Sequence, residues 1–266
     1  MEHSPPSGSI NLKPLGIIRS CYQQKFSIPR QPGLAPDAPA IITISAGKED
    51  QPQQLLEGIE SFSHLWILFY FHNLKNSPEA RNKVRPPRLG GEKSTGSLAC
   101  RSPYRPNPIG LSVVKLEKCL HTQGTSSLLV TGGDFLDGTP ILDIKPYLPY
   151  CDSVPEAKTS WANRPEQSLQ RVSFSDKARN TLKRLGGSAW DFMLKSISQS
   201  LLTDPRPSWR QRKFPGDDER TYHTAMFGLD LHWQLQQFTV LVTEISLLDK
   251  DCLSLFNSFW SGKETK

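Results

Sequence analysis

Several large protein classes are disfavoured by what this 266-residue sequence lacks. No strand-like run is followed by Gly-x-Gly-x-x-Gly, and no Gly-x-x-x-x-Gly-Lys-Ser/Thr phosphate loop occurs, which argues against a doubly wound nucleotide-binding fold. The absence of His-Glu-x-x-His and Gly-x-Ser-x-Gly argues against metallohydrolases and serine hydrolases. The longest uninterrupted apolar run, residues 65–71, is far shorter than the roughly 20 residues that span a bilayer.

Targeting and cross-linking signals are equally scarce. The first residues lack the apolar core of a secretory signal, so we expect a cytoplasmic location. The five cysteines form no Cys-x-x-Cys pair, and the six histidines show no metal-ligand spacing along the sequence. These observations favour reduced thiols, no disulfide framework and no bound metal.

Glycine and proline, in contrast, are abundant, at 18 and 22 residues. A helical bundle does not tolerate that density, because an interior proline costs about 3 kcal/mol and an interior glycine about 1 kcal/mol. The 32 Lys and Arg residues exceed the 26 Asp and Glu residues and give a net charge of +6, which suits an anionic partner. We therefore expect a globular protein rich in strands and loops.

Residues 11–165 have the pattern of short strands between turns, preceded by a disordered tail over residues 1–10. One helix is predicted at 52–60. The segment 62–71 is apolar on both faces, which is typical of a central strand with two neighbours. Further strands are predicted at 14–18, 40–44, 111–116 and 127–131.

Residues 166–266 follow a polar linker and have a different texture. A first helix should begin at Ser175 as N-cap and end at the Gly-Gly of 186–187, and a second should begin at Ser188. Strands are predicted at 221–227, 231–235 and 238–245, with a turn at 228–230. The fold class is thus mainly β, with a small α+β domain at the C-terminus.

Four proline-rich or turn-rich segments carry most of the unusual chemistry: 25–33, 84–91, 101–112 and 137–150. Each of the first two could also be an ordinary surface loop. Segment 101–112 interleaves three prolines with Tyr, Arg and Asn, so it presents polar side chains from a rigid backbone. The fourth alternates and places Asp143, Lys145 and Tyr147 on one face, which a solvent-facing edge strand would also do.

These segments resemble the TsaA family. The resemblance rests on Arg-Ser-Pro-Tyr-Arg-Pro-Asn-Pro-Ile-Gly at 101–110, Asp-Gly-Thr-Pro-x-x-Asp-Ile-Lys-Pro-Tyr at 137–147, the Pro-Arg-Gln-Pro-Gly turn at 29–33, and residues 62–68. It covers about residues 15–150. The string Asp-Pro-Arg-Pro-Ser-Trp-Arg at 204–210 also resembles the second domain of bacterial-type members, whereas the residues beyond it match less well.

The resemblance implies a small β-barrel methyltransferase, unlike the Rossmann methyltransferases, that works as a homodimer. It implies S-adenosyl-L-methionine as cofactor and tRNA as substrate, with methylation at N6 of N6-threonylcarbamoyladenosine at position 37 (t6A37). The residues that it places at the cofactor are Pro29, Arg30, Gln31, His72, Asn73, Arg101, Leu111, Asp137, Gly138, Thr139 and Pro140.

The acceptor nitrogen must lose a proton at or near methyl transfer, so a base is needed. Our hypothesis is that Asp143, Lys145 and Tyr147 form the catalytic cluster, with either Asp143 or deprotonated Tyr147 as the base. Some site residues could come from the second subunit. Contacts to the phosphates of the anticodon loop are predicted for Arg85, Arg88, Arg105, Arg206 and Arg210.

Two alternatives remain open from the sequence. A methyltransferase of the same fold could use another RNA base or a small molecule as acceptor. A non-catalytic RNA-binding module could retain the barrel without binding the cofactor.

Overall fold

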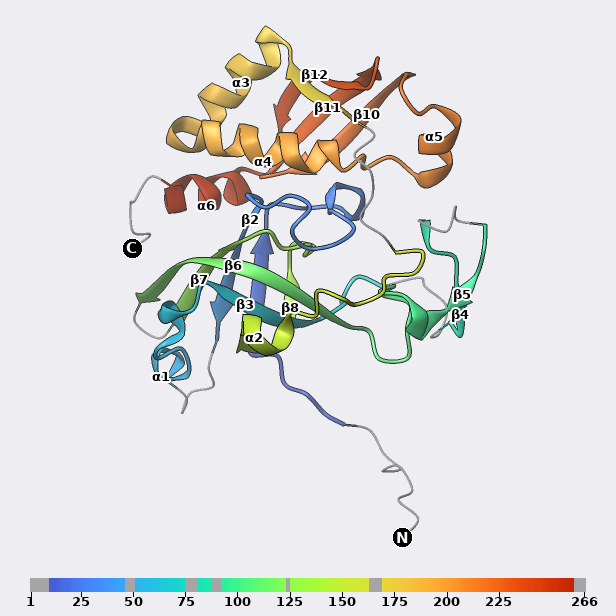
Figure 1. Ribbon diagram of the computed structural model, residues 1–266. Coiled ribbons are helices and arrows are strands. Elements are labelled where there is room, and N and C mark those ends of the chain that lie inside the picture. Colours follow the sequence, from blue (N-terminus) through green and yellow to red (C-terminus); the bar gives the residue numbers. More distant parts are fainter. Residues whose placement is uncertain are drawn as a thin grey trace.

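The N-terminal half forms a closed six-stranded β-barrel, which confirms the predicted fold class (Figure 1). The computed structural model describes residues 10–45, 51–74, 81–87, 92–122, 125–162 and 169–260, so the predicted disordered tail lies almost wholly outside the described residues. All neighbouring barrel strands are antiparallel. In spatial order they are β1 (Gly16–Ser20), β2 (Pro39–Ile44), β7 (Thr125–Thr131), β6 (Ile109–Thr122), β3 (His64–Tyr70) and β8 (Thr139–Pro146).

The barrel interior is filled by alternate side chains of each strand. In β3 the inward residues Leu65, Ile67 and Phe69 are buried, as the pleat requires. The opposite face of β3 carries the apolar residues Trp66 and Leu68. Trp66 packs there against Tyr147, with ring centroids 5.7 Å apart. The prediction of a strand with two neighbours is therefore confirmed, since β6 and β8 flank β3.

The predicted helix at 52–60 is wrong in length. The structure has a single turn, α1 (Pro52–Leu55), followed by a 3-10 turn at Ile59–Ser61. Gly58 separates them with a φ of 81°, in the left-handed region that ends a helix. Strand β6 is longer than predicted and continues to Thr122 through an irregularity between Leu116 and Lys118.

The C-terminal part is a four-stranded sheet with helices on one side (Figure 1). Its strand order is β10-β11-β12-β9, and β9 runs parallel to β12. Neither β9 nor the last helix, α6, was predicted. The bounds are β9 (Arg171–Phe174), α3 (Asp176–Gly186), α4 (Trp190–Leu202), α5 (Ser208–Lys213), β10 (Asp218–Met226), β11 (Leu229–Gln236), β12 (Thr239–Leu247) and α6 (Lys250–Trp260).

Local signals placed the ends of α3 but not the start of α4. The Ser175 side chain accepts a hydrogen bond from the backbone N–H of Ala178, which confirms the predicted cap. Ser188 is not a cap, because it lies within a 3-10 turn at Gly187–Ala189 that leads into α4. The β10–β11 turn is also tighter than predicted, since its positive φ values are at Phe227 and Gly228.

The two parts share a hydrophobic core. Cys21 and Tyr22, which follow β1, pack with α4 residues and with Phe227. The Tyr22 hydroxyl is 2.9 Å from the Ser200 Oγ, and the Phe227 N–H donates to the Cys21 carbonyl at 2.9 Å. Smaller elements complete the structure: β4 (Lys83–Val84), β5 (Thr95–Gly96) and α2 (Pro149–Asp152). None of the helices in the described ranges is long and apolar enough to cross a membrane.

Candidate functional site

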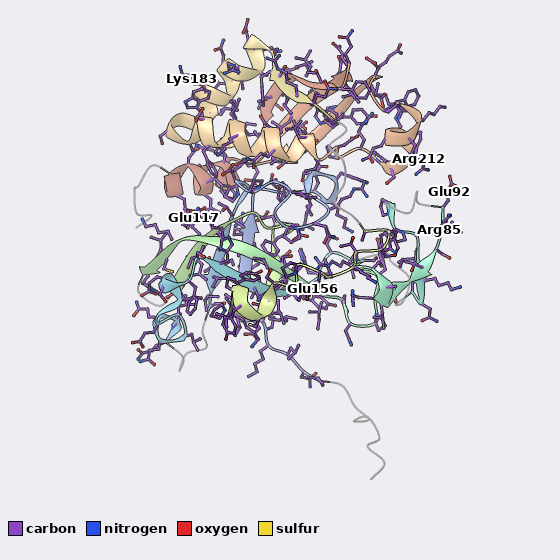
Figure 2. All side chains as sticks on the ribbon, viewed as in Figure 1. Arg85, Glu92, Glu117, Glu156, Lys183 and Arg212 are labelled. Atoms are coloured by element: carbon purple, nitrogen blue, oxygen red, sulfur yellow. The ribbon has the colours of Figure 1, made fainter. Side chains whose placement is uncertain are left out.

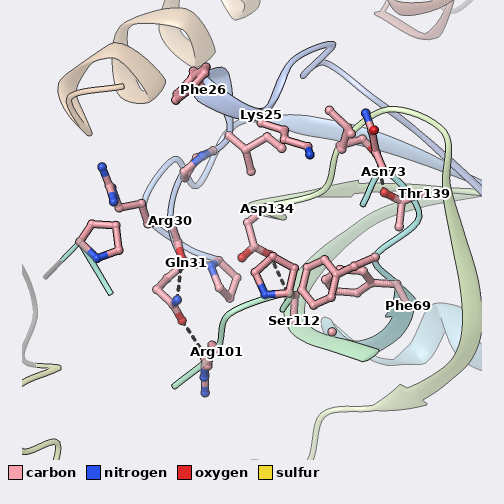
Figure 3. Close-up of a pocket in the computed structure, with 18 of the residues that line it drawn as sticks. Lys25, Phe26, Arg30, Gln31, Phe69, Asn73, Arg101, Ser112, Asp134 and Thr139 are labelled. Carbon is pink, nitrogen blue, oxygen red and sulfur yellow. Dashed lines mark hydrogen bonds between the residues drawn. The ribbon is translucent and has the colours of Figure 1, made fainter. Parts of the chain in front are cut away.

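A cavity of about 730 Å³ opens where one end of the barrel faces the C-terminal part (Figure 3). Its walls come from residues 25–32, the end of β3 and the residues after it, the proline-rich segment before β6, the start of β8, and residues 203–208. Pro87 of segment 84–91 also lines it, so all four unusual segments contribute to one site, although they are far apart in the sequence. The volume lies in the range typical of sites for cofactor-sized ligands.

The carboxyl group of Asp134 lies in the cavity wall. It accepts a hydrogen bond of 2.5 Å from the Ser112 hydroxyl on β6 (Figure 3). Burial raises the pKa of Asp134 to about 6, against the lowering effects of the Ser112 hydrogen bond and the positive charge of Arg101. At neutral pH this carboxylate is mostly ionised but poorly solvated, so a cationic group on a ligand would stabilise its negative charge.

Arg101 and Gln31 join two of the predicted cofactor segments. The Arg101 Nη1 donates to the Gln31 Oε1 at 2.8 Å, and the Gln31 amide donates to the Arg30 carbonyl (Figure 3). Arg30 in turn reaches the Ser208 Oγ at 3.4 Å. This chain of contacts links residues 29–32, the start of segment 101–112, and the C-terminal part, along one side of the cavity.

The remaining predicted cofactor residues divide into two groups. His72, Asn73, Leu111 and Thr139 line the cavity with Pro29, Arg30, Gln31 and Arg101. Burial lowers the pKa of His72; the charge of Asp137 opposes this shift and that of Lys25 adds to it, so the surroundings favour the neutral imidazole. Its Nδ1 is 3.4 Å from the Thr139 hydroxyl.

Asp137, Gly138 and Pro140 do not line the cavity. Asp137 accepts hydrogen bonds from the Arg19 Nε at 3.1 Å and from the Ser20 N–H at 2.8 Å. Gly138 adopts a φ of 79°, which favours glycine. These residues shape the turn that presents Thr139 to the cavity.

Sequence reasoning missed Asp134, Ser112, Phe69 and residues 203–208 as cavity residues. The Gly-Gly-Asp at 132–134 was an available turn signal. Phe69 packs edge to face against both Phe71 and Phe135 and gives the cavity an apolar floor. Nothing in local sequence indicated that residues 203–208 would face the barrel.

Asp143, Lys145 and Tyr147 lie outside this cavity. Asp143 and Lys145 form an exposed ion pair of 3.1 Å, and Tyr147 packs on Trp66. Since Asp143 pairs in register with Leu68, and Lys145 with Trp66, they lie on the outer face of the barrel. The structure thus keeps the three residues together but separates them from the cofactor residues of the same chain.

The five predicted RNA-contacting arginines differ in exposure. Arg85 is exposed near the edge that also carries Glu92 and Arg212, and the Arg212 Nη2 is 3.7 Å from the Glu92 carboxylate (Figure 2). Arg105 lines the cavity and donates to the Cys100 carbonyl at 3.2 Å. Arg88 lies outside the described residues.

Arg206 and Arg210 do not match the expectation of free phosphate-binding groups, because both are buried. The Arg206 guanidinium donates to both carboxylate oxygens of Asp204, at 2.8 and 2.7 Å. Arg210 forms a two-point ion pair with Asp218. Their hydrogen-bonding groups are engaged inside the C-terminal part, so we exclude them from the RNA surface.

Family models match both parts of the chain. The tRNA-methyltransferase O N-terminal domain matches residues 17–153, and the TrmO C-terminal domain matches residues 166–248. The chain belongs to the tRNA-methyltransferase O family. This TrmO-family assignment confirms the resemblance that the sequence motifs indicated.

The relatives of this TrmO-family chain include solved and named proteins. The crystal structure of TrmO from Pseudomonas aeruginosa matches 91% of this chain and 99% of that one, with a TM-score of 0.72 and 36% identity. An Escherichia coli protein named tRNA (adenine(37)-N6)-methyltransferase is 37% identical over 85% of this chain and 94% of its own length. A Pseudomonas aeruginosa protein named as a candidate S-adenosylmethionine-dependent methyltransferase, RcsF, is 43% identical over 84% of this chain and 91% of its own.

Proposed function

We propose that this chain is an S-adenosylmethionine-dependent tRNA methyltransferase that acts on N6 of adenosine 37, with t6A37 as the acceptor. The observation that carries the proposal is the cavity, whose walls hold the strings shared with the family. The name of the Escherichia coli relative supports tRNA position 37. We assign residues 11–165 to the catalytic domain and residues 166–266 to a second domain that closes the cavity.

The residues around the cavity fit the chemical groups of S-adenosylmethionine, which supplies a methyl group on a sulfonium cation. Asp134 can attract the sulfonium or the ammonium group. Arg101 and Arg30 offer guanidinium donors to the carboxylate. Phe69 and Phe71 give an apolar surface for the remaining ligand area.

The protein contributes mainly alignment to the reaction. The bond from N6 to the methyl carbon forms as the carbon–sulfur bond breaks, and the leaving thioether is neutral, so no metal is required. The N6 proton must pass to a base, because the threonylcarbamoyl group delocalises the nitrogen lone pair. An ordered cavity that holds both reactants in line supplies much of the rate enhancement.

The base in this proposal comes from a second copy of the chain. Asp143, Lys145 and Tyr147 lie on the outer face of the barrel, where a homodimer partner could receive them at its own cavity. A symmetric dimer would then contain two equivalent composite sites. Asp143 or the deprotonated form of Tyr147 accepts the proton, and Lys145 stabilises the negative charge that develops on the acceptor.

Mixing two variants tests this arrangement, at a cofactor concentration so low that Asp134→Asn binds little cofactor and is inactive by itself. Asp134→Asn removes a cavity residue and Asp143→Asn removes a residue supplied to the other copy, so a mixed dimer retains one intact site. Random exchange of subunits should restore about a quarter of wild-type activity. Single-turnover methylation of each variant and of the refolded mixture provides the measurement. Full activity of Asp143→Asn alone would remove this residue from the mechanism.

Arg85 should contribute to tRNA binding without contributing to chemistry. Arg85→Ala removes one exposed cation, so the tRNA dissociation constant should rise and the slope of log K against log salt should fall by about 1. The rate at saturating tRNA should not change. Titration of labelled tRNA at several salt concentrations gives the slope, and an unaltered slope would place Arg85 outside the interface.

Mass spectrometry of nucleosides tests the function directly. The enzyme is incubated with methyl-labelled cofactor and tRNA from cells with and without the threonylcarbamoyl modification. We expect label in the N6-methylated form of t6A37 and none in the unmodified tRNA. Label in another nucleoside would favour the same fold with a different acceptor. Absence of cofactor binding by calorimetry would favour a non-catalytic RNA-binding module.

The cytoplasm is the compartment that we propose, since tRNA modification occurs where tRNA is used.

A further inference from the structure

Two histidines that are nine residues apart in the sequence meet on the second sheet. His223 on β10 pairs in register with His232 on β11, and their ring centroids are 4.1 Å apart. Asp230 lies two residues before His232 on the same strand, so the two side chains share a face. That face is opposite the buried residues Leu229, Leu231 and Trp233.

The three side chains converge on one point. The His223 Nδ1 is 3.2 Å from the Asp230 Oδ2, and the His232 Nε2 is 3.1 Å from the same oxygen. The three donor atoms all lie within 4.8 Å of one another. A tetrahedral zinc ion with bonds of about 2.0–2.1 Å separates its ligand atoms by about 3.3 Å, which is close to both contacts.

We propose that His223, Asp230 and His232 bind one divalent transition-metal ion of the Zn²⁺ class. Two imidazoles and one carboxylate match the preference of zinc for nitrogen and oxygen ligands. Magnesium and calcium prefer sites made of oxygen atoms, so this set selects against them. Three protein ligands leave further coordination positions for water or for a group on a partner.

Solvent access supports such a site. The His223 side chain is 57% exposed, and the side chains of Asp230 and His232 are each 26% exposed, so an ion can enter without unfolding. Glu244 on β12 pairs in register with His232 and lies on the same face, where the positive charge of Lys177 offsets its negative charge. Lys177 is paired with Glu244 at 2.7 Å.

The competing explanation is that both imidazoles simply donate hydrogen bonds to Asp230. One carboxylate oxygen would then accept two N–H groups from adjacent rings. His232→Gln separates the two cases, because a glutamine amide can still donate to Asp230 but does not replace imidazole as a zinc ligand.

Calorimetric titration of the full chain with ZnCl₂, after treatment with a chelator, provides the test. Wild type should bind one Zn²⁺ per chain, and Mg²⁺ should not compete. His223→Ala and His232→Gln should each weaken Zn²⁺ binding by more than about tenfold. His121→Ala is the matched control, because His121 lies on β6 and contacts Ser126, and it should bind like wild type.

Cobalt substitution adds a second readout. Co²⁺ should give the visible absorption of a low-coordinate site in wild type, and this signal should be lost in His232→Gln. Thermal unfolding of the metal-free variants checks that each is folded. Stoichiometric Zn²⁺ binding that survives in both variants, or no stoichiometric binding in wild type, would overturn the proposal. Neither outcome bears on the proposed methyltransferase activity, because none of the three ligands lines the cavity.

Discussion

Asp134→Asn should weaken S-adenosylmethionine binding by about 10- to 100-fold, because a hydrogen bond or ion pair to a charged group contributes about 1.5–3 kcal/mol. The substitution keeps the size of the side chain and an oxygen that can accept the Ser112 hydroxyl. It removes only the negative charge that faces the cavity. Calorimetry with the cofactor gives the dissociation constant. Asp176→Asn is the control, since Asp176 is exposed on α3 and does not line the cavity.

The pH dependence should follow the same carboxyl group. Because the pKa of Asp134 is about 6, wild type should lose cofactor affinity as the pH falls below 6 and the charge disappears. Asp134→Asn should show a flatter profile over this range. Equal pH profiles for the two proteins would mean that another group binds the cation.

Lowering the pH should raise the stability of the wild-type fold while it weakens cofactor binding. The pKa of Asp134 is raised from 3.8 to about 6, so between these pH values the folded state holds more protons than the unfolded state. Raising the pH through this window therefore destabilises the fold, by at most about 3 kcal/mol. Asp134→Asn should be more stable than wild type above pH 6 and lose this advantage near pH 4. Denaturant unfolding at both pH values measures the difference.

Local sequence signals predicted the elements whose ends depend on nearby residues. Ser175 and the glycines at 186–187 placed the ends of α3, and short apolar runs between turns placed β2 and β7. β9 was missed because four residues, Arg171–Phe174, form a strand only by pairing in parallel with β12, about 70 residues later. α1 was too long in the prediction because the apolar spacing across Gly58 outweighed the conformational preference of glycine.

The candidate site was predictable to the extent that its segments carry unusual sequences. Alternation correctly placed Asp143 and Lys145 on one face, but which side of the barrel they occupy depends on the pairing of β8 with β3. That pairing is shifted by an irregularity between Leu68 and Phe69, which local sequence does not reveal. His223 and His232 showed no ligand spacing because their proximity arises across a hairpin.

Arg206 and Arg210 were predicted to contact RNA, because local sequence does not reveal that both side chains are buried. Their burial leads us to expect that loss of their ion-pair partner has a large effect on stability. Both guanidinium groups converge on Asp218. Arg210 donates to both of its carboxylate oxygens, Arg206 Nη1 lies 3.5 Å away, and the Tyr222 hydroxyl donates at 2.5 Å. Asp218 itself is 3% exposed. Its negative charge therefore offsets positive charge that is removed from water.

Asp218→Asn should cost about 3–5 kcal/mol of unfolding free energy at neutral pH, because it leaves buried positive charge uncompensated. Burial alone would raise the pKa of Asp218, but hydrogen bonds from Tyr222 and Arg210 outweigh it and the pKa is lowered. The carboxylate thus stabilises the fold above the unfolded-state pKa, and this contribution is lost in acid as the folded-state group protonates. The difference in unfolding free energy between Asp218→Asn and wild type should accordingly become smaller below about pH 4. Denaturant unfolding across this pH range measures it.

The same variant should also reduce cofactor affinity, although Asp218 does not line the cavity. Asp218 contacts Arg206, and residues 203–208 form one wall of the site, so disorder there opens the cavity. Lys115→Ala is the matched control, because its ion pair with Glu117 is exposed and such pairs contribute little. If Asp218→Asn were instead as stable as wild type and changed only the affinity for tRNA, Arg206 and Arg210 would again be assigned to the RNA-binding surface.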